Sequence, residues 1–204
     1  KNLIDLKNIK ETNTSIRALA YQLYENNGVI KRDEVLNFIK FLKQDERKIL
    51  REMGVKFGRY HIFLHRLFKP NAVLLRTLLW KNYHQKYFNL EPPKFGLNFF
   101  EDKKNIKQSF MLICGFEKFD KYYVRIDILE RLFLKIMNSD QNKEKEIKLT
   151  SEMLNLLGCS KDVFSNLIQK MNYKIFFRDN NFYFKYLSNK KNKKKFVSKK
   201  KNNN

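Results

Sequence analysis

The sequence predicts a mainly α protein with a small β component, in which a helical domain is followed by a winged-helix-like unit. Three observations support this fold class. Apolar residues recur at helical spacing in several separate stretches. A stretch containing proline and glycine, residues 89–109, interrupts that pattern. Beyond it the residues favour strand, helix, short helix, turn, helix and hairpin in that order, which is the order of a winged helix-turn-helix.

Three helices are predicted between residues 14 and 53. The first carries one apolar stripe, formed by Ile16, Leu19, Ala20, Leu23 and Tyr24. Asn26-Asn27-Gly28 is a natural stop, because Asn and Gly tolerate the left-handed conformation at a helix end. Similar stripes follow in residues 35–42 and 49–53.

The rest of the first domain, which we place at residues 1–88, contains an extended segment and a further helix. Residues 55–64 alternate loosely around Gly58, which indicates extended structure or a short hairpin. Pro70 suits the first turn of a helix, where no backbone N–H is needed. The segment from Asn71 to about Phe88 is apolar on most sides, so we expect a central buried helix.

Residues 89–109 are expected to be a loop or linker, and residues 110–187 the winged-helix-like domain. Helices are predicted at 126–137, 151–157 and 161–171, and strands at 122–124, 173–178 and 182–186. Residues 139–148 read as a polar loop. The last residues, 188–204, are rich in lysine and are expected to form a disordered basic tail.

The charge of the chain points to a polyanionic partner. Forty-three Lys and Arg against 21 Asp and Glu give a net charge of +22, which attracts nucleic acid or acidic lipid headgroups. An alternative is a lysine- and asparagine-rich compositional bias, since most of the cations are Lys. Two cysteines are too few for a disulfide framework, and we find no membrane span or signal peptide. We therefore expect a cytoplasmic fragment of a longer protein.

No catalytic motif is recognisable in this segment, so we assign no catalytic and no metal-binding residues. A glycine loop followed by Lys-Ser/Thr, which an ATPase needs to hold phosphates, is missing from the sequence. His61 and His65 have a spacing that could share a metal on a helix, but their segment reads as extended and no third ligand is close. Cys159 has no adjacent base and is expected to be a small buried thiol.

Cations and aromatics are interleaved in two segments that could contact nucleic acid. Cations bind phosphates, and aromatic faces stack on unpaired bases. The candidate binding residues are Lys56, Arg59, Tyr60, His61, Lys69 and Arg76 in the first segment and Lys174, Arg178 and Lys185 in the C-terminal hairpin. The alternative is that the aromatics form core and the cations a solvated rim. The outward face of the predicted helix 161–171 is polar but hardly basic, which disfavours sequence-specific duplex reading.

Several motifs resemble the C-terminal region of the suppressor-of-var RNA helicases, the superfamily 2 helicases of the mitochondrial degradosome and their bacterial relatives. The resemblance covers roughly residues 16–186. It rests on the following segments, in the order of the family: Arg17-Ala-Leu-Ala-Tyr-Gln-Leu, Gln44-Asp-Glu-Arg, Gly54-Val-Lys-Phe-Gly-Arg-Tyr-His-Ile-Phe-Leu, Leu67-Phe-Lys-Pro70, Leu78-Leu-Trp80, Val124-Arg-Ile-Asp-Ile-Leu-Glu-Arg-Leu132 and Met153-Leu-Asn-Leu-Leu-Gly-Cys-Ser160.

The resemblance implies a parent protein that is an ATP-dependent RNA helicase, with ATP and magnesium bound by two motor domains N-terminal to this segment. The segment itself would be an accessory region that contacts RNA nonspecifically and passes the strand toward an exoribonuclease partner. No cofactor is expected in the segment. Two other functions stay open: a standalone winged-helix DNA-binding regulator, and a protein-interaction module that docks a nuclease.

Overall fold

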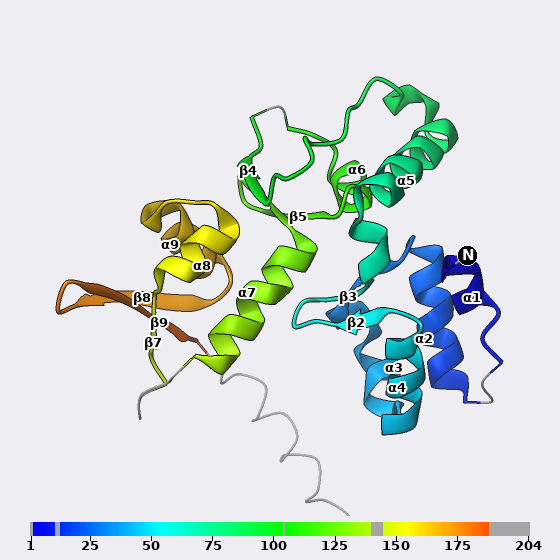
Figure 1. Cartoon of the computed structure of the whole chain (residues 1–204), viewed down its shortest axis with the longest axis horizontal. Coiled ribbons are helices and arrows are strands. Elements are labelled where there is room, and N and C mark those ends of the chain that lie inside the picture. The colour runs from blue at the N-terminus through cyan, green and yellow to red at the C-terminus, as the bar shows by residue number, and fades with distance from the viewer. Residues whose placement is uncertain (1, 11–12, 104, 140–144, 188–204) are drawn as a thin grey trace, which may run out of the picture.

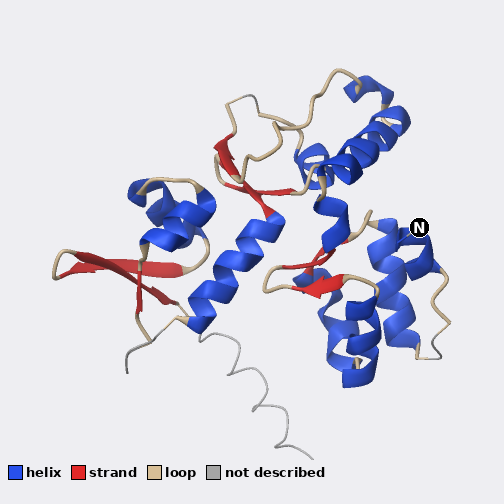
Figure 2. Cartoon of the chain, viewed as in Figure 1, coloured by secondary structure: helices blue, strands red, loops and turns tan. Residues whose placement is uncertain are grey.

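The computed structural model describes residues 2–10, 13–103, 105–139 and 145–187. The described chain is mainly helical with three small antiparallel sheets, which confirms the predicted fold class at that level (Figures 1 and 2). Among these residues no helix combines the length and the apolar character that crossing a membrane requires. The predicted basic tail, residues 188–204, lies outside the described residues.

The N-terminal part packs short helices against the first sheet. Its helices are α1 (Asn2–Lys7), α2 (Thr14–Glu25), the 3-10 helix η1 (Arg32–Val35), α3 (Leu36–Phe41) and α4 (Gln44–Glu52). The strands are β1 (Val29–Lys31), β2 (Val55–Phe57) and β3 (His61–Leu64), in the order β1-β3-β2. The predicted apolar stripe of α2 is buried at Ile16, Leu19, Ala20 and Leu23. Residues 55–64, for which extended structure or a short hairpin was expected, form a hairpin of β2 and β3.

Helix α5 (Pro70–Tyr83) starts at the predicted proline, between the 3-10 helices η2 (His65–Phe68) and η3 (Gln85–Tyr87). The prediction that it is a central buried helix is wrong. It lies at the periphery, beside α6, and its inward face carries Val73, Arg76 and Thr77. Leucines on its other face are exposed. An apolar sequence all round the helix gave no indication of which side would be buried.

A second sheet occupies part of the stretch expected to be a linker. Strand β4 (Phe99–Glu101) pairs with β6 (Tyr122–Arg125), which also pairs with β5 (Phe116–Phe119). Helix α6 (Gln108–Ile113) precedes β5. The linker interpretation of 89–109 therefore needs correction at two places. At residues 99–101 backbone hydrogen bonds to β6 outweigh the weak strand signal of the sequence, and at residues 108–109 helix α6 has already begun.

The C-terminal part has the predicted helices and hairpin in the predicted order, together with a two-residue strand in the stretch expected to be a polar loop. It comprises α7 (Ile126–Asn138), β7 (Ile147–Lys148), α8 (Ser151–Leu157), α9 (Lys161–Lys170), β8 (Tyr173–Arg178) and β9 (Asn181–Tyr186). The third sheet has the order β7-β9-β8. Gly158 ends α8 in the left-handed conformation (φ 72°), and the Ser160 hydroxyl caps α9 by accepting the Val163 N–H.

Helix α7 packs against both the N-terminal part and the C-terminal part of the chain. Its N-terminal residue Ile126 is buried with Val29 and Phe63 of the first sheet. Its remaining apolar side packs against α8, α9 and the third sheet. Figure 1 shows α7 running between the N-terminal helices and the β8–β9 hairpin. This position brings the β2–β3 turn of the N-terminal part to the C-terminal core.

Candidate nucleic-acid interface

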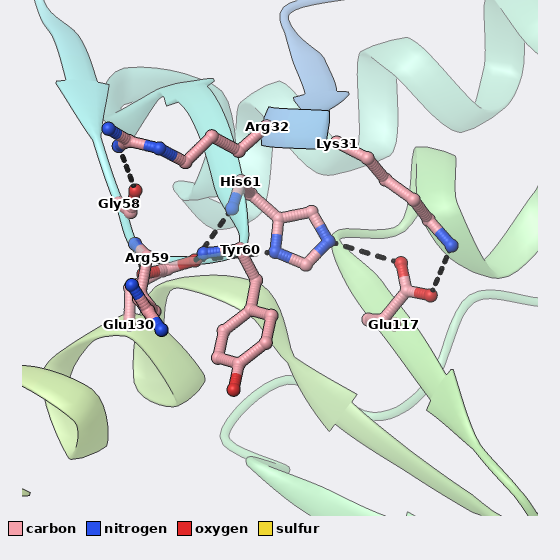
Figure 3. A network of polar contacts seen from close by, with 8 residues as sticks. All are labelled: Lys31, Arg32, Gly58, Arg59, Tyr60, His61, Glu117 and Glu130. Carbon is pink, nitrogen blue, oxygen red and sulfur yellow. Dashed lines mark hydrogen bonds and ion pairs between the residues drawn. The ribbon is translucent and has the colours of Figure 1, made fainter. Parts of the chain in front are cut away.

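The β2–β3 turn and the first residue of β3 carry three of the predicted binding residues, and a single carboxylate attaches them to α7 (Figure 3). Glu130 accepts hydrogen bonds from the backbone N–H groups of Arg59, Tyr60 (2.9 Å) and His61 (2.8 Å). The side chain of Glu130 is buried, so these three donors replace the water that a free carboxylate would bind. Arg32 secures the other side of the turn by donating from Nη1 to the Gly58 carbonyl (2.7 Å).

His61 connects this carboxylate to a second one. Its Nε2 lies 3.1 Å from Oε2 of Glu117, and its Nδ1 lies 3.4 Å from Oε1 of Glu130. Glu117 also pairs with Lys31, Nζ to Oε1 2.9 Å. Burial opposes the protonation of His61, but hydrogen bonds and negative charge from the two carboxylates outweigh it and raise the His61 pKa above 6.5. The pKa of Glu117 is lowered despite its burial, because His61 and Lys31 favour the charged form.

Tyr60 points into the C-terminal core. Its ring lies 4.5 Å from that of Phe133, centroid to centroid, and burial raises the pKa of the phenol to about 12. Its aromatic face is therefore not presented to a base. Tyr60 is half-buried against Phe133 and His61 is buried, and both positions count against the expectation that these residues contribute to a binding surface.

Arg76 is also buried, on the inward face of α5. Its Nη1 donates to the Leu67 carbonyl (3.4 Å), and burial lowers the guanidinium pKa to about 10. It cannot contact phosphate from this position, which removes a third predicted residue from the surface. Lys56, Arg59 and Lys69 remain exposed.

The three predicted hairpin residues lie together on one face of the third sheet. Alternation along the strands places Lys174, Phe176 and Arg178 of β8 on the same side. The register pairs Lys174 with Lys185 and Phe176 with Tyr183, so β9 adds Lys185 and Tyr183 to that side. The opposite side holds Tyr173, Ile175 and Phe184, which belong to or pack against the core. We call the first side the outer sheet face.

Strand β7 contributes one cation that the sequence did not single out. Lys148 pairs with Tyr183 and is exposed, so it extends the outer sheet face by one strand. The sequence reads as a polar loop at this position, because two residues of strand are too few to recognise by alternation. The only sequence signal was the polar Lys148 next to the apolar Ile147.

The geometry of the outer sheet face combines positive charge with aromatic surface. The rings of Phe176 and Tyr183 are stacked at 6.1 Å with an interplanar angle of 8°, and the Arg178 guanidinium lies 5.8 Å from each. Arg178 also pairs with Glu146, Nη2 to Oε2 3.2 Å, so its charge is partly neutralised. Lys174, Phe176 and Lys185 line a hollow of about 440 Å³ on this face.

Arg59 reaches the edge of the same sheet from the N-terminal part. Its guanidinium lies 5.7 Å from the ring of Tyr186 at the end of β9. Tyr186 pairs with Tyr173 and so belongs to the side opposite the outer sheet face. Arg59 is thus a neighbour of the outer sheet face rather than a part of it.

Neither thiol has the properties of a nucleophile. Burial raises the pKa of Cys114 to about 12 and that of Cys159 to about 11, which keeps both protonated near neutral pH. Within the described ranges, no group of three or more His, Cys, Asp or Glu side chains is arranged to hold a metal ion. No family model, no curated protein and no solved structure matches this chain.

Proposed function

We propose that this chain is the C-terminal RNA-binding accessory region of an ATP-dependent RNA helicase, and that it contacts single-stranded RNA through the outer sheet face. The observation that carries the proposal is the cluster of Lys148, Lys174 and Lys185 around the stacked pair Phe176 and Tyr183. Ammonium groups neutralise phosphates without regard to sequence, and exposed ring faces stack on unpaired bases.

The arrangement of the C-terminal part supports a winged-helix-like unit that uses its hairpin rather than its third helix. The order α7, β7, α8, α9, β8, β9 is that of a winged helix-turn-helix. The outward residues of α9 are polar, and Asp162 offsets Lys161 at its start. A sequence-specific DNA-binding regulator would need base-reading side chains and phosphate contacts on that helix. The hairpin is therefore the better candidate surface.

The wider role rests on the family resemblance. ATP and magnesium would be bound by the motor domains of the parent protein, and an exoribonuclease would receive the strand in the cytoplasm. This part of the proposal is tested by the reading frame upstream of Lys1. A glycine-rich phosphate loop and an acidic magnesium-binding box are expected there, and an upstream region without them would remove the helicase assignment.

RNA binding is tested by fluorescence anisotropy with a labelled single strand at several salt concentrations. For about four phosphates neutralised, log affinity against log salt should slope at roughly −3. Lys174→Ala/Lys185→Ala should reduce the steepness of that slope by roughly 1.4 and weaken binding about tenfold or more. Phe176→Ala should weaken binding by about 1–3 kcal/mol through lost stacking.

The matched control is Lys40→Ala/Lys48→Ala, which removes the same charge from exposed positions on α3 and α4. It should change affinity much less than the hairpin double variant. Equal losses from both pairs would mean that only total charge matters and that the outer sheet face is not a site. A strong preference for one duplex sequence would favour the DNA-binding regulator instead.

A further inference from the structure

Helix α5 is inverted with respect to the usual distribution of side chains. Its inward face buries Arg76 and Thr77, while Leu75, Leu78 and Leu79 are 57%, 58% and 61% exposed. Arg and Thr are among the residues most often found at the surface, and Leu among those most often buried. Leu74, at 46% exposed, completes the set. We call Leu74, Leu75, Leu78 and Leu79 the leucine face.

The contacts of α5 hold it in this orientation. The Trp80 ring lies 5.4 Å from that of Phe110 on α6, and Trp80 packs against the cluster of buried side chains there. Val73 is buried on the same side. Turning the leucine face inward would expose Trp80 and Val73, so the helix cannot bury both sides within this chain.

The buried polar groups show that the inward face is not simply the more apolar one. The Thr77 hydroxyl is satisfied locally by the Val73 carbonyl at 2.9 Å. Nε and Nη2 of Arg76 are buried without a hydrogen-bond partner among the described residues. Burial of such groups is unfavourable. The fold therefore keeps a costly inward face while four leucines stay in water.

The leucine face is one continuous stripe. Spacing of i, i+1, i+4 and i+5 puts its members on one side of the helix, and Tyr83, 86% exposed, extends it toward the C-terminal end. Single exposed leucines are ordinary, but contiguous apolar patches rimmed by polar groups mark interaction sites. An apolar stripe of this form fits the apolar face of another helix.

We propose that the leucine face docks an amphipathic helix of a separate protein whose apolar stripe is flanked by Asp and Glu. The positive charge around α5 is the reason for choosing an acidic partner. From Met53 to Leu90 the sequence has no Asp or Glu and seven Lys or Arg. Lys69 precedes α5 and is exposed, and Lys81 lies in its last turn. Acidic flanks on the partner would pair with these ends, and charge complementarity of this kind selects partners and speeds association.

Other occupants fit less well. A second copy would bring the same cations together in a symmetric interface, which like-charge repulsion disfavours. The lysine-rich segment 189–204 carries no acid and lacks the complementary charge. RNA gains nothing from leucines, which neither stack on bases nor donate to phosphates. The inference does not depend on RNA binding, which we assign to the outer sheet face.

The test uses two labelled helical peptides with the same leucine stripe, one flanked by glutamates and one by lysines. Anisotropy with residues 1–204 should show binding of the glutamate peptide and at least about tenfold weaker binding of the lysine peptide. Leu75→Ser/Leu79→Ser should weaken binding of the glutamate peptide about tenfold or more. The control Leu134→Ser/Met137→Ser, at residues 59% and 65% exposed on α7, should leave it unchanged.

Circular dichroism and RNA affinity should be the same for the leucine variant and the wild type. If that variant does not fold, the proposal is still tested by comparing the affinities of the two peptides for the wild-type chain. The proposal is overturned if neither peptide binds, if both bind equally, or if the α5 and α7 variants lose binding to the same extent. Sedimentation that shows a dimer dependent on Leu75 and Leu79 would assign the leucine face to a second copy. Loss of RNA binding in the folded leucine variant would assign it to RNA.

Discussion

The carboxylate of Glu130 lies directly over the α-carbon of Gly58, so close that a methyl group at residue 58 would overlap it. This relationship explains why the segment that forms the β2–β3 turn has a glycine at residue 58. The backbone of the β2–β3 turn must approach α7 closely enough for three N–H groups to reach one carboxylate. Only a residue without a side chain permits that approach.

Gly58→Ala is therefore expected to destabilise the fold, because the added methyl group displaces Glu130 from its donors. We expect a loss of about 2–4 kcal/mol in the free energy of unfolding, measured by denaturant titration. Gly54→Ala would test a different effect, since a methyl group there meets no neighbour and only the backbone conformation (φ 93°) is strained. A Gly58→Ala protein as stable as the wild type would contradict the close packing.

Glu130→Ala should be among the most damaging single changes in the chain. It leaves three backbone donors, each at least partly buried, without an acceptor, and it leaves the buried His61 with one carboxylate fewer. The expected cost is about 3–5 kcal/mol, by analogy with other broken buried ion pairs. Glu152→Ala is the control, because Glu152 pairs with Lys135 at the surface and its loss should change the melting temperature little. Similar melting temperatures for the two variants would show that the network contributes no more than a surface pair.

Stability should depend on pH through His61 and Glu117. The folded pKa of His61 is raised, so its contribution is complete below the unfolded value of 6.5 and is lost as pH rises through the folded pKa. The pKa of Glu117 is lowered, so its contribution is present above 4.5 and is lost as pH falls through the folded pKa. The network is therefore most stabilising between about pH 4.5 and 6.5.

His61→Gln should remove the part of the decline that occurs above pH 6.5, because glutamine does not titrate. Urea titrations of wild type and variant across this range measure the difference, which amounts to about 1.4 kcal/mol for each pH unit by which the folded His61 pKa exceeds the unfolded one. Parallel pH profiles for the two proteins would show that His61 does not titrate in this range.

Arg59 and Tyr60 should respond differently to alanine, although they are adjacent. Tyr60→Ala removes a ring packed on Phe133 and should cost about 2–3 kcal/mol of stability with little loss of RNA affinity in the protein that remains folded. Arg59→Ala leaves the core intact and should change stability little, since its side chain is exposed. Melting temperature and RNA anisotropy on both variants separate these effects. A stable Tyr60→Ala protein with weakened RNA binding would return Tyr60 to the binding surface.

The sequence by itself determined the elements whose signals are local. The apolar stripes of α2 and α9 repeat with the helical period, and Asp179-Asn180 forms a turn between two strands, so each could be recognised within a few residues. The hairpin cations Lys174, Arg178 and Lys185 could also be named as candidates from the sequence. Alternate residues of a strand lie on one side of a sheet, and in the structure all three lie on the outer sheet face.

Tertiary structure decided what depends on contacts between distant residues. Glu130 lies about seventy positions from the backbone groups that it binds, and no local pattern could associate them. That contact packs Tyr60 against the C-terminal core and buries His61, although the sequence had made both candidates for contact with nucleic acid. Helix α5 is apolar on most sides, so the spacing of its apolar residues does not show which side is buried. Packing of Trp80 against Phe110 places Arg76 inside and the leucines outside. The physical reason is the same in both cases. Whether a side chain is buried depends on the residues that pack over it, and here those residues are distant in the sequence.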